Sequence, residues 1–212
     1  MTHSATGRPG PSFRWWAVVS AVIAPVAMIG GWQLAAARQP PGYSAIRDTI
    51  SALAGHGAHD RWVMTLGLVV VGCCHLVTAA GLPVARPAGR ILLAVGGAAT
   101  VAVAALPQPV SGSAPGHTLA AGTAFLALTF WSLAAYPAGA PVGVLRLPIL
   151  LPATVALVGL LVVFYLELHG GHRIGLTERL LAGAQSVWPV VILASVFLAG
   201  KGKPARPAVA RV

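Results

Sequence analysis

Six long apolar stretches, separated by short segments rich in polar residues, proline and glycine, dominate the pattern of the chain. An α-helix needs about 20 mostly apolar residues to cross the hydrocarbon core of a bilayer. The stretches approach or reach that length. The pattern therefore predicts an all-α, polytopic membrane domain at 15–199, with spans at 15–37, 62–82, 91–106, 118–136, 147–168 and 180–199.

The two ends of the chain have a different character. Residues 1–14 are rich in glycine, proline and serine, and residues 200–212 combine basic residues with proline and alanine. Such compositions bury too little apolar surface to fold. We expect a disordered cytoplasmic N-terminus and a basic cytoplasmic tail.

The longest polar interval lies between the first two spans, at 40–62. Ile46, Ile50 and Leu53 are spaced four and three residues apart, which places them on one face of a short helix. Ser44 is the predicted N-cap and Gly55 the predicted stop. We expect a short amphipathic helix lying over the mouth of the bundle. The alternative is a plain connector that covers the helix ends.

Composition supports a membrane protein. Hydrophobic residues form 57% of the chain and charged residues only 8%, against about 25% charged residues in an ordinary soluble domain. The net charge of +10 resembles that of a nucleic-acid-binding protein. The cations, however, stand in short runs at the ends of apolar stretches, as expected for a membrane protein. We therefore predict lipid contacts and no nucleic-acid partner.

The positions of the charges predict an orientation. With both termini in the cytoplasm, nine Lys and Arg residues lie on the inner side. Five lie on the outer side, together with all four acids: Asp48, Asp60, Glu167 and Glu178. This asymmetry agrees with the positive-inside rule. It predicts a multi-pass protein of the cell membrane with both ends cytoplasmic.

Histidines gather on the predicted outer face: His56, His59, His117, His169 and His172. Imidazole and carboxylate groups are the usual ligands of zinc, so His117, His169 and His172 are candidate metal ligands. Their spacing matches no metal motif. We favour hydrogen bonding and lipid-headgroup contacts, and we predict no cofactor.

Two ionisable groups near or within the spans have alternative roles. Glu167 ends the fifth span, where Arg179 is a natural partner; a role in substrate binding or proton handling is the alternative. His75 is the histidine deep inside a span, and we expect a polar contact between helices there. No second histidine lies at its depth, which argues against bis-histidine haem.

No phosphate-binding loop, GxSxG or HExxH motif is present. Our first hypothesis is therefore an accessory, non-catalytic protein whose outer loops bind lipid headgroups, a protein partner or a second copy. The second is an enzyme acting on a lipid-linked substrate through the outer His, Asp and Glu residues. The third is a small carrier, which is weakened because no acid or base lies at the predicted midplane.

Three segments of the chain resemble the bacterial integral membrane family called domain of unknown function 998. They are GYSAIRDTISALAGHGAHDRWVM, ALPQPVSGSAPGHTLAAGTAF and GLTERLLAGAQSVWPVV. The chain departs from the family pattern at Leu106 and Gln108, where an aromatic residue and an acid are usual. The resemblance implies a six-helix membrane protein and no particular activity. Together with Glu167, which the residue pattern singled out, it directs attention to an outer-face polar site of Tyr43, Ser44, Asp48, Ser51, His117, Glu178 and Arg179.

Overall fold

The computed structural model describes residues 14–137 and 143–201, and within these ranges it contains seven helices and no strand. The long helices are α1 (Trp15–Ala36), α3 (Trp62–Ala80), α4 (Pro87–Ala105), α5 (Pro115–Ala134), α6 (Leu147–Leu168) and α7 (Ile174–Lys201), and the short one is α2 (Ile50–Leu53). All six long helices are long and apolar enough to cross a membrane. The predicted all-α, six-span fold is confirmed. Most of the predicted disordered N-terminus and basic tail lies outside the described residues.

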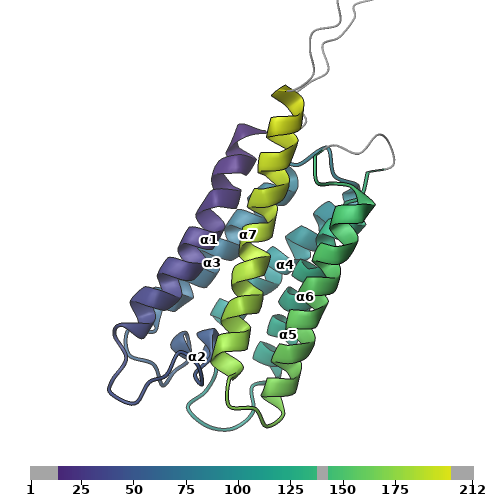
Figure 1. Cartoon of the computed structure of the whole chain (residues 1–212). Coiled ribbons are helices and arrows are strands. Elements are labelled where there is room, and N and C mark those ends of the chain that lie inside the picture. The colour runs from purple at the N-terminus through teal and green to yellow at the C-terminus, as the bar shows by residue number, and fades with distance from the viewer. Residues whose placement is uncertain (1–13, 138–142, 202–212) are drawn as a thin grey trace, which may run out of the picture.

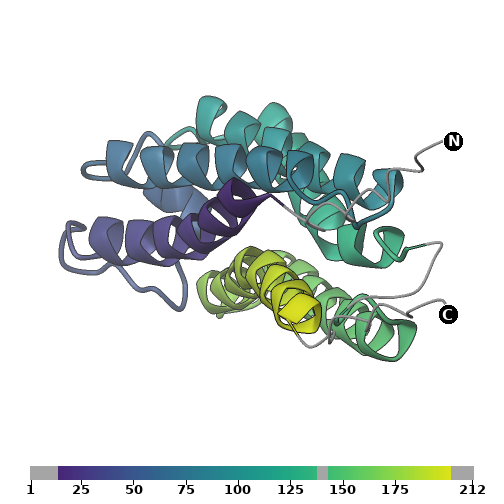
Figure 2. The ribbon, with the colours of Figure 1, turned by 90° about the horizontal axis from the view of Figure 1, so that it is seen from above.

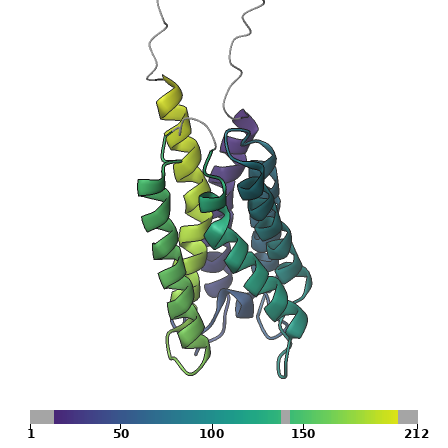
Figure 3. The same cartoon turned by 90° about the vertical axis from the view of Figure 1, so that its right-hand side faces the viewer.

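The six long helices form a ring (Figures 1 and 2). Each packs against the next along the chain, and α7 returns to pack against α1. The contact between α5 and α6 is the least extensive in the ring. Helix α1 begins and α7 ends at the same end of the bundle (Figures 1 and 3). Helix α2 lies at the opposite end against α1, α3 and α7, and we refer to this as the α2 end.

Two clusters of apolar side chains fill the ring. One includes Leu93, Trp131 and Ile192, in the half where α1 begins, and the other includes Met64 and Val71, nearer the α2 end. Small residues let the helices approach closely: a Cβ atom on Gly72 of α3 would collide with the backbone of α4. The outer surfaces of α1 and α6 remain apolar and exposed, as expected for surfaces that face lipid.

Three helices begin earlier than the apolar pattern predicts. Helix α4 starts at Pro87 and α5 at Pro115, because proline suits the first turn of a helix, where no backbone N–H is needed. Helix α7 starts at Ile174, six residues before the predicted start at Leu180. The earlier start of α7 places Glu178 and Arg179 in a helix, whereas the sequence predicted them in a loop.

Candidate functional site

Helix α2 is built differently from the prediction. Its N-cap is Thr49, whose Oγ1 accepts a 2.9 Å hydrogen bond from Ala52 N. The predicted cap, Ser44, instead begins a turn in which its backbone N–H donates to Asp48 Oδ2 at 2.7 Å. Because this turn delays the helix, Ile46 is 51% exposed, whereas Ile50 is buried. The helix predicted for this loop is present, but it is only four residues long and is inserted into the end of the ring.

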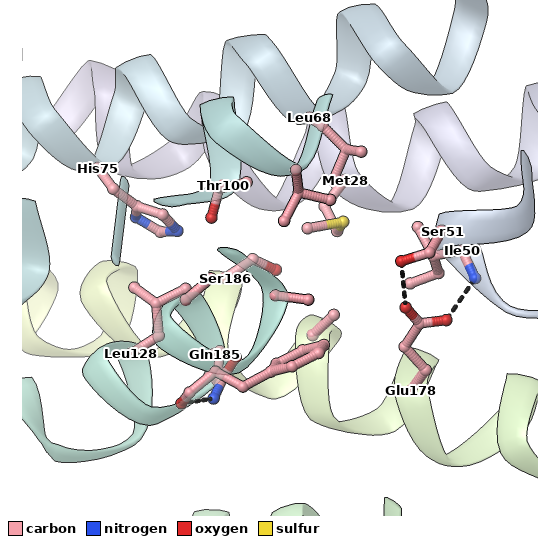
Figure 4. A pocket seen from close by; sticks show the side chains of 15 residues that line it. Met28, Ile50, Ser51, Leu68, His75, Thr100, Leu128, Glu178, Gln185 and Ser186 are labelled. Atoms are coloured by element: carbon pink, nitrogen blue, oxygen red, sulfur yellow. Dashed lines mark hydrogen bonds between the residues drawn. The ribbon is translucent and has the colours of Figure 1, made fainter. Parts of the chain in front are cut away.

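Glu178 joins α7 to α2 inside the bundle (Figure 4). Its side chain is buried, with 3% of its surface exposed. The backbone N–H of Ile50 donates to Oε2, and Ser51 Oγ donates to Oε1 at 3.1 Å. A buried carboxyl group without partners is costly, and these two donors reduce that cost. The carboxyl group therefore holds α2 in place.

Arg179, the next residue of α7, fixes the preceding part of the same loop. Its Nη1 donates to the carbonyl oxygens of Ala45, Asp48 and Gly175 at 2.7–2.8 Å, and its Nη2 donates to the Tyr43 hydroxyl. We call Tyr43, Asp48 and Arg179 the clamp. Burial raises the pKa of the Tyr43 hydroxyl above its usual value; the positive charge of Arg179 opposes that rise, and the negative charges of Asp48 and Glu178 add to it.

Backbone hydrogen bonds unite three distant segments at the α2 end. His56 N donates to Gln108 O at 2.9 Å, and Leu176 N donates to Ile46 O at 3.1 Å. The three segments that carry the family resemblance thus meet in one place. Their shared position explains why polar residues recur there in an otherwise apolar chain.

A groove of about 730 Å³ lies between α5 and α6. This volume falls in the range of about 300–1,000 Å³ that is usual for small-molecule sites. Its walls along the helices are apolar and include Phe125, Leu161 and Phe164. Its polar end includes Ser51 and Glu178, together with Thr49, Gln108, His117, Thr118 and His169. The groove is therefore amphipathic along its length.

A second, internal cavity of about 50 Å³ meets the groove at four residues that line both: Ser51, Ala121, Phe125 and Glu178. Figure 4 shows Glu178 at one end of this cavity and His75 at the other. His75 is 1% exposed, and neither of its ring nitrogens has a hydrogen-bond partner. The predicted polar contact between helices at His75 is therefore wrong. Its imidazole lines the cavity instead.

The predicted site residues separate into three groups. Ser51, His117 and Glu178 line the groove. Tyr43, Asp48 and Arg179 form the clamp, to which Ser44 is joined through Asp48. Glu167 is the third group by itself, since it is part of neither the groove lining nor the clamp.

Glu167 has a local partner. Its Oε2 accepts a 2.7 Å hydrogen bond from Arg173 N, just before α7 begins. The expected pairing with Arg179 does not form, because the guanidinium is occupied by the 40–48 segment. Over the described ranges, no three His, Cys, Asp or Glu side chains are arranged to hold a metal ion. His117, His169 and His172 therefore do not form such a group.

Sequence reasoning missed several residues that build the groove and cavity. Gly122 and Phe125 belong to apolar stretches that carry no chemical signal. Gln185 is 1% exposed and donates to Phe125 O and Thr129 Oγ1. A buried glutamine in a span was the one available clue.

The ring of apolar helices, with a polar site buried under one end, defines a multi-pass membrane protein. A family model described as "Protein of unknown function (DUF998)" matches residues 13–195. The chain belongs to this family, as its three polar segments predict. No curated protein and no solved structure matches the chain.

Proposed function

We propose that this protein binds a single-chain amphiphile, drawn from the membrane, in the groove between α5 and α6. The observation that carries the proposal is the polarity of the groove: apolar walls lead to a polar end at Ser51, His117 and Glu178. An amphiphile has the same distribution of polarity. Its chain would lie along the two helices and its head would lie beside Glu178.

We place the α2 end outside the cytoplasm of a cell membrane, because the side that holds the chain termini carries the larger share of Lys and Arg residues. The polar end of the groove then lies near the outer headgroup layer. In this position the protein acts as an accessory protein that holds a lipid and carries out no reaction.

Two glycines provide a matched test. Gly122 lies on α5 and lines the groove, whereas Gly159 lies on α6 and is not part of the groove lining. A Cβ atom at either position would meet no described atom within 4 Å. Gly122→Leu should therefore fill the groove without disturbing the fold, and Gly159→Leu is the control. Both variants would be reconstituted in vesicles that contain a monoacylglycerol bearing a diazirine on its acyl chain, and the crosslinked residues would be mapped by mass spectrometry.

Wild type and Gly159→Leu should crosslink at Leu126, Leu161 and Val162 in the groove. Gly122→Leu should reduce this labelling by roughly fivefold or more, because overfilling a site typically costs about 1–3 kcal/mol. Equal labelling of all three proteins at these residues would show that the groove does not hold the chain.

One observation favours a second candidate function, an enzyme acting on a lipid-linked substrate. Ser51 Oγ donates to the buried carboxyl group of Glu178 at the polar end of the groove, and a hydroxyl beside a base is the arrangement of an activated nucleophile. Incubation with a monoacylglycerol would test this function. Release of the fatty acid by wild type, but not by Ser51→Ala, would support it.

The carrier hypothesis has the least support. The internal cavity ends at His75, and the apolar cluster that includes Leu93, Trp131 and Ile192 fills the bundle beyond it. A carrier needs a site that opens to each side in turn.

A further inference from the structure

Among the described residues, Glu178 is the one formally charged residue that lines the groove or the internal cavity, with histidines counted as neutral. The part of the chain that the structure describes places no lysine or arginine in the lining of either space. The neighbouring Arg179 lines neither, because its guanidinium is directed to the carbonyl oxygens and the hydroxyl of the clamp. The electrostatic character of the head site is therefore set by a carboxyl group.

Among the described residues, six hydroxyl groups line the groove or the cavity. Those of Thr49 and Tyr165 keep a hydrogen to donate, and the other four have committed theirs. Ser51 donates to Glu178, Thr118 to Ala114 O at 3.1 Å, Thr100 to Gly96 O at 2.8 Å and Ser186 to Gly183 O at 2.9 Å. A hydroxyl group has one hydrogen and two lone pairs. These four side chains therefore offer a ligand acceptors and no donors.

The histidines of the groove are oriented in the same way. His117 Nδ1 lies 2.8 Å from Leu106 O, and His169 Nδ1 lies 2.9 Å from Tyr165 O. A carbonyl oxygen only accepts, so Nδ1 carries the hydrogen, and in the neutral ring Nε2 is left as an acceptor. His75, buried and unpartnered at the end of the cavity, adds one acceptor nitrogen and one N–H donor. The site is thus rich in acceptors.

We infer that the amphiphile bound in the groove carries a protonated amine as its head. An ammonium group has three N–H donors and a positive charge, which complements the acceptors and Glu178. An anionic head would face the carboxyl group of Glu178, and the described lining of the groove offers no lysine or arginine to bind it. An uncharged hydroxyl head has one O–H donor and would therefore satisfy fewer of these acceptors than an ammonium group. This inference rests on the proposed function, because it identifies the ligand class of that groove.

The test compares three ligands with the same chain: dodecylamine, dodecanol and dodecanoic acid at pH 7, where an alkylamine is protonated. Each would compete with the diazirine-bearing monoacylglycerol for crosslinking to the full-length protein in vesicles. Dodecylamine should compete about tenfold more strongly than dodecanol, because hydrogen bonds from a charged donor are about twice as strong as neutral ones. Dodecanoic acid should be the weakest competitor.

Variants assign the effect to the carboxyl group. In Glu178→Gln, dodecylamine should compete for crosslinking no more than about twofold better than dodecanol, since a charge-assisted hydrogen bond is replaced by a neutral one. If Glu178→Gln does not fold, the wild-type ranking alone decides. Equal competition by amine and alcohol, stronger competition by the acid, or an amine advantage that survives in folded Glu178→Gln would each overturn the inference.

The two proposals fail in different ways. If wild type shows no groove crosslinking and none of the three ligands has an effect, the proposed function itself is wrong. If Gly122→Leu abolishes groove crosslinking but the three ligands compete equally in wild type, the groove binds amphiphiles and only the amine inference is wrong.

Discussion

Arg179 and Tyr43, 136 residues apart in the chain, are joined by a hydrogen bond from the guanidinium to the phenol oxygen. The adjacent Glu178 holds Ile50 and Ser51. Two consecutive residues of α7 thus fix two parts of the same loop. Arg179 belongs to the clamp and Glu178 lines the groove, so the clamp and the site are adjacent on α7.

Replacing Arg179 by lysine should destabilise the protein. A lysine keeps the charge but cannot reach the carbonyl oxygens of Ala45 and Asp48 and the Tyr43 hydroxyl together. We expect a loss of about 2 kcal/mol, the typical value for hydrogen bonds to a charged group. Thermal unfolding in detergent measures it. The exposed Arg173 provides the control, and a loss as large in Arg173→Lys would contradict the role of the clamp.

Gly175→Ala should loosen the same contact from the backbone side. A Cβ atom at Gly175 would collide with the carbonyl oxygens of Asp48 and Ala45, and overpacking of this kind costs about 1–3 kcal/mol. We expect a lower melting temperature and faster proteolysis within residues 40–48. Gly30→Ala, where a Cβ atom meets open space, is the matched control. Wild-type stability in Gly175→Ala would show that the loop is not held closely against α7.

His75→Leu should leave stability unchanged or raise it. The imidazole is buried with two unpartnered nitrogens, so leucine removes unsatisfied polar atoms without breaking a hydrogen bond. Gln185→Leu should instead destabilise the protein by about 1–3 kcal/mol, because it removes two hydrogen bonds and leaves Phe125 O and Thr129 Oγ1 with one donor fewer. Unfolding of both variants in the same detergent compares them. A marked loss in His75→Leu would mean that the ring binds something in the cavity.

The raised pKa of Tyr43 predicts a loss of stability in alkali. The folded protein favours the neutral phenol more than the unfolded chain does, so this contribution is fully present below the usual pKa of 10.0 and is lost as the pH rises through the folded value. Wild type should therefore lose more stability than Tyr43→Phe between neutral pH and pH values above 10. Urea unfolding at several pH values measures the difference. Parallel curves for the two proteins would contradict this prediction.

The spans were predictable because each consists of about twenty apolar residues, a signal that does not depend on tertiary contacts. The start of α7 was not. Thr177, Glu178 and Arg179 resemble a polar loop in sequence, but 40–53 covers them, and the polar groups of the two segments satisfy one another. Buried polar pairs between distant segments leave no local pattern, so the apolar pattern placed the boundary six residues too late.

The candidate site was predictable in part for the same reason. Ser51, His117 and Glu178 stand out as polar residues in an apolar chain, and the structure brings them to one groove. The apolar wall of that groove is made by Gly122, Phe125 and Leu161, which resemble every other span residue. Glu167 also stands out, but it only accepts a hydrogen bond from Arg173 N. Polarity alone does not distinguish a residue that lines the groove from one that only accepts a hydrogen bond from a nearby backbone N–H.

The groove lies between α5 and α6, and apolar side chains of both helices wall it. On the proposed function, we expect its ligand to enter sideways, from the hydrocarbon of the bilayer. A molecule that enters there is already dissolved in the bilayer and arrives by diffusion in two dimensions. Occupancy will then follow the mole fraction of that molecule among the surrounding lipids, and its concentration in the aqueous phase matters only through partitioning. Dilution with inert phospholipid should empty the protein, whereas dilution with buffer should not.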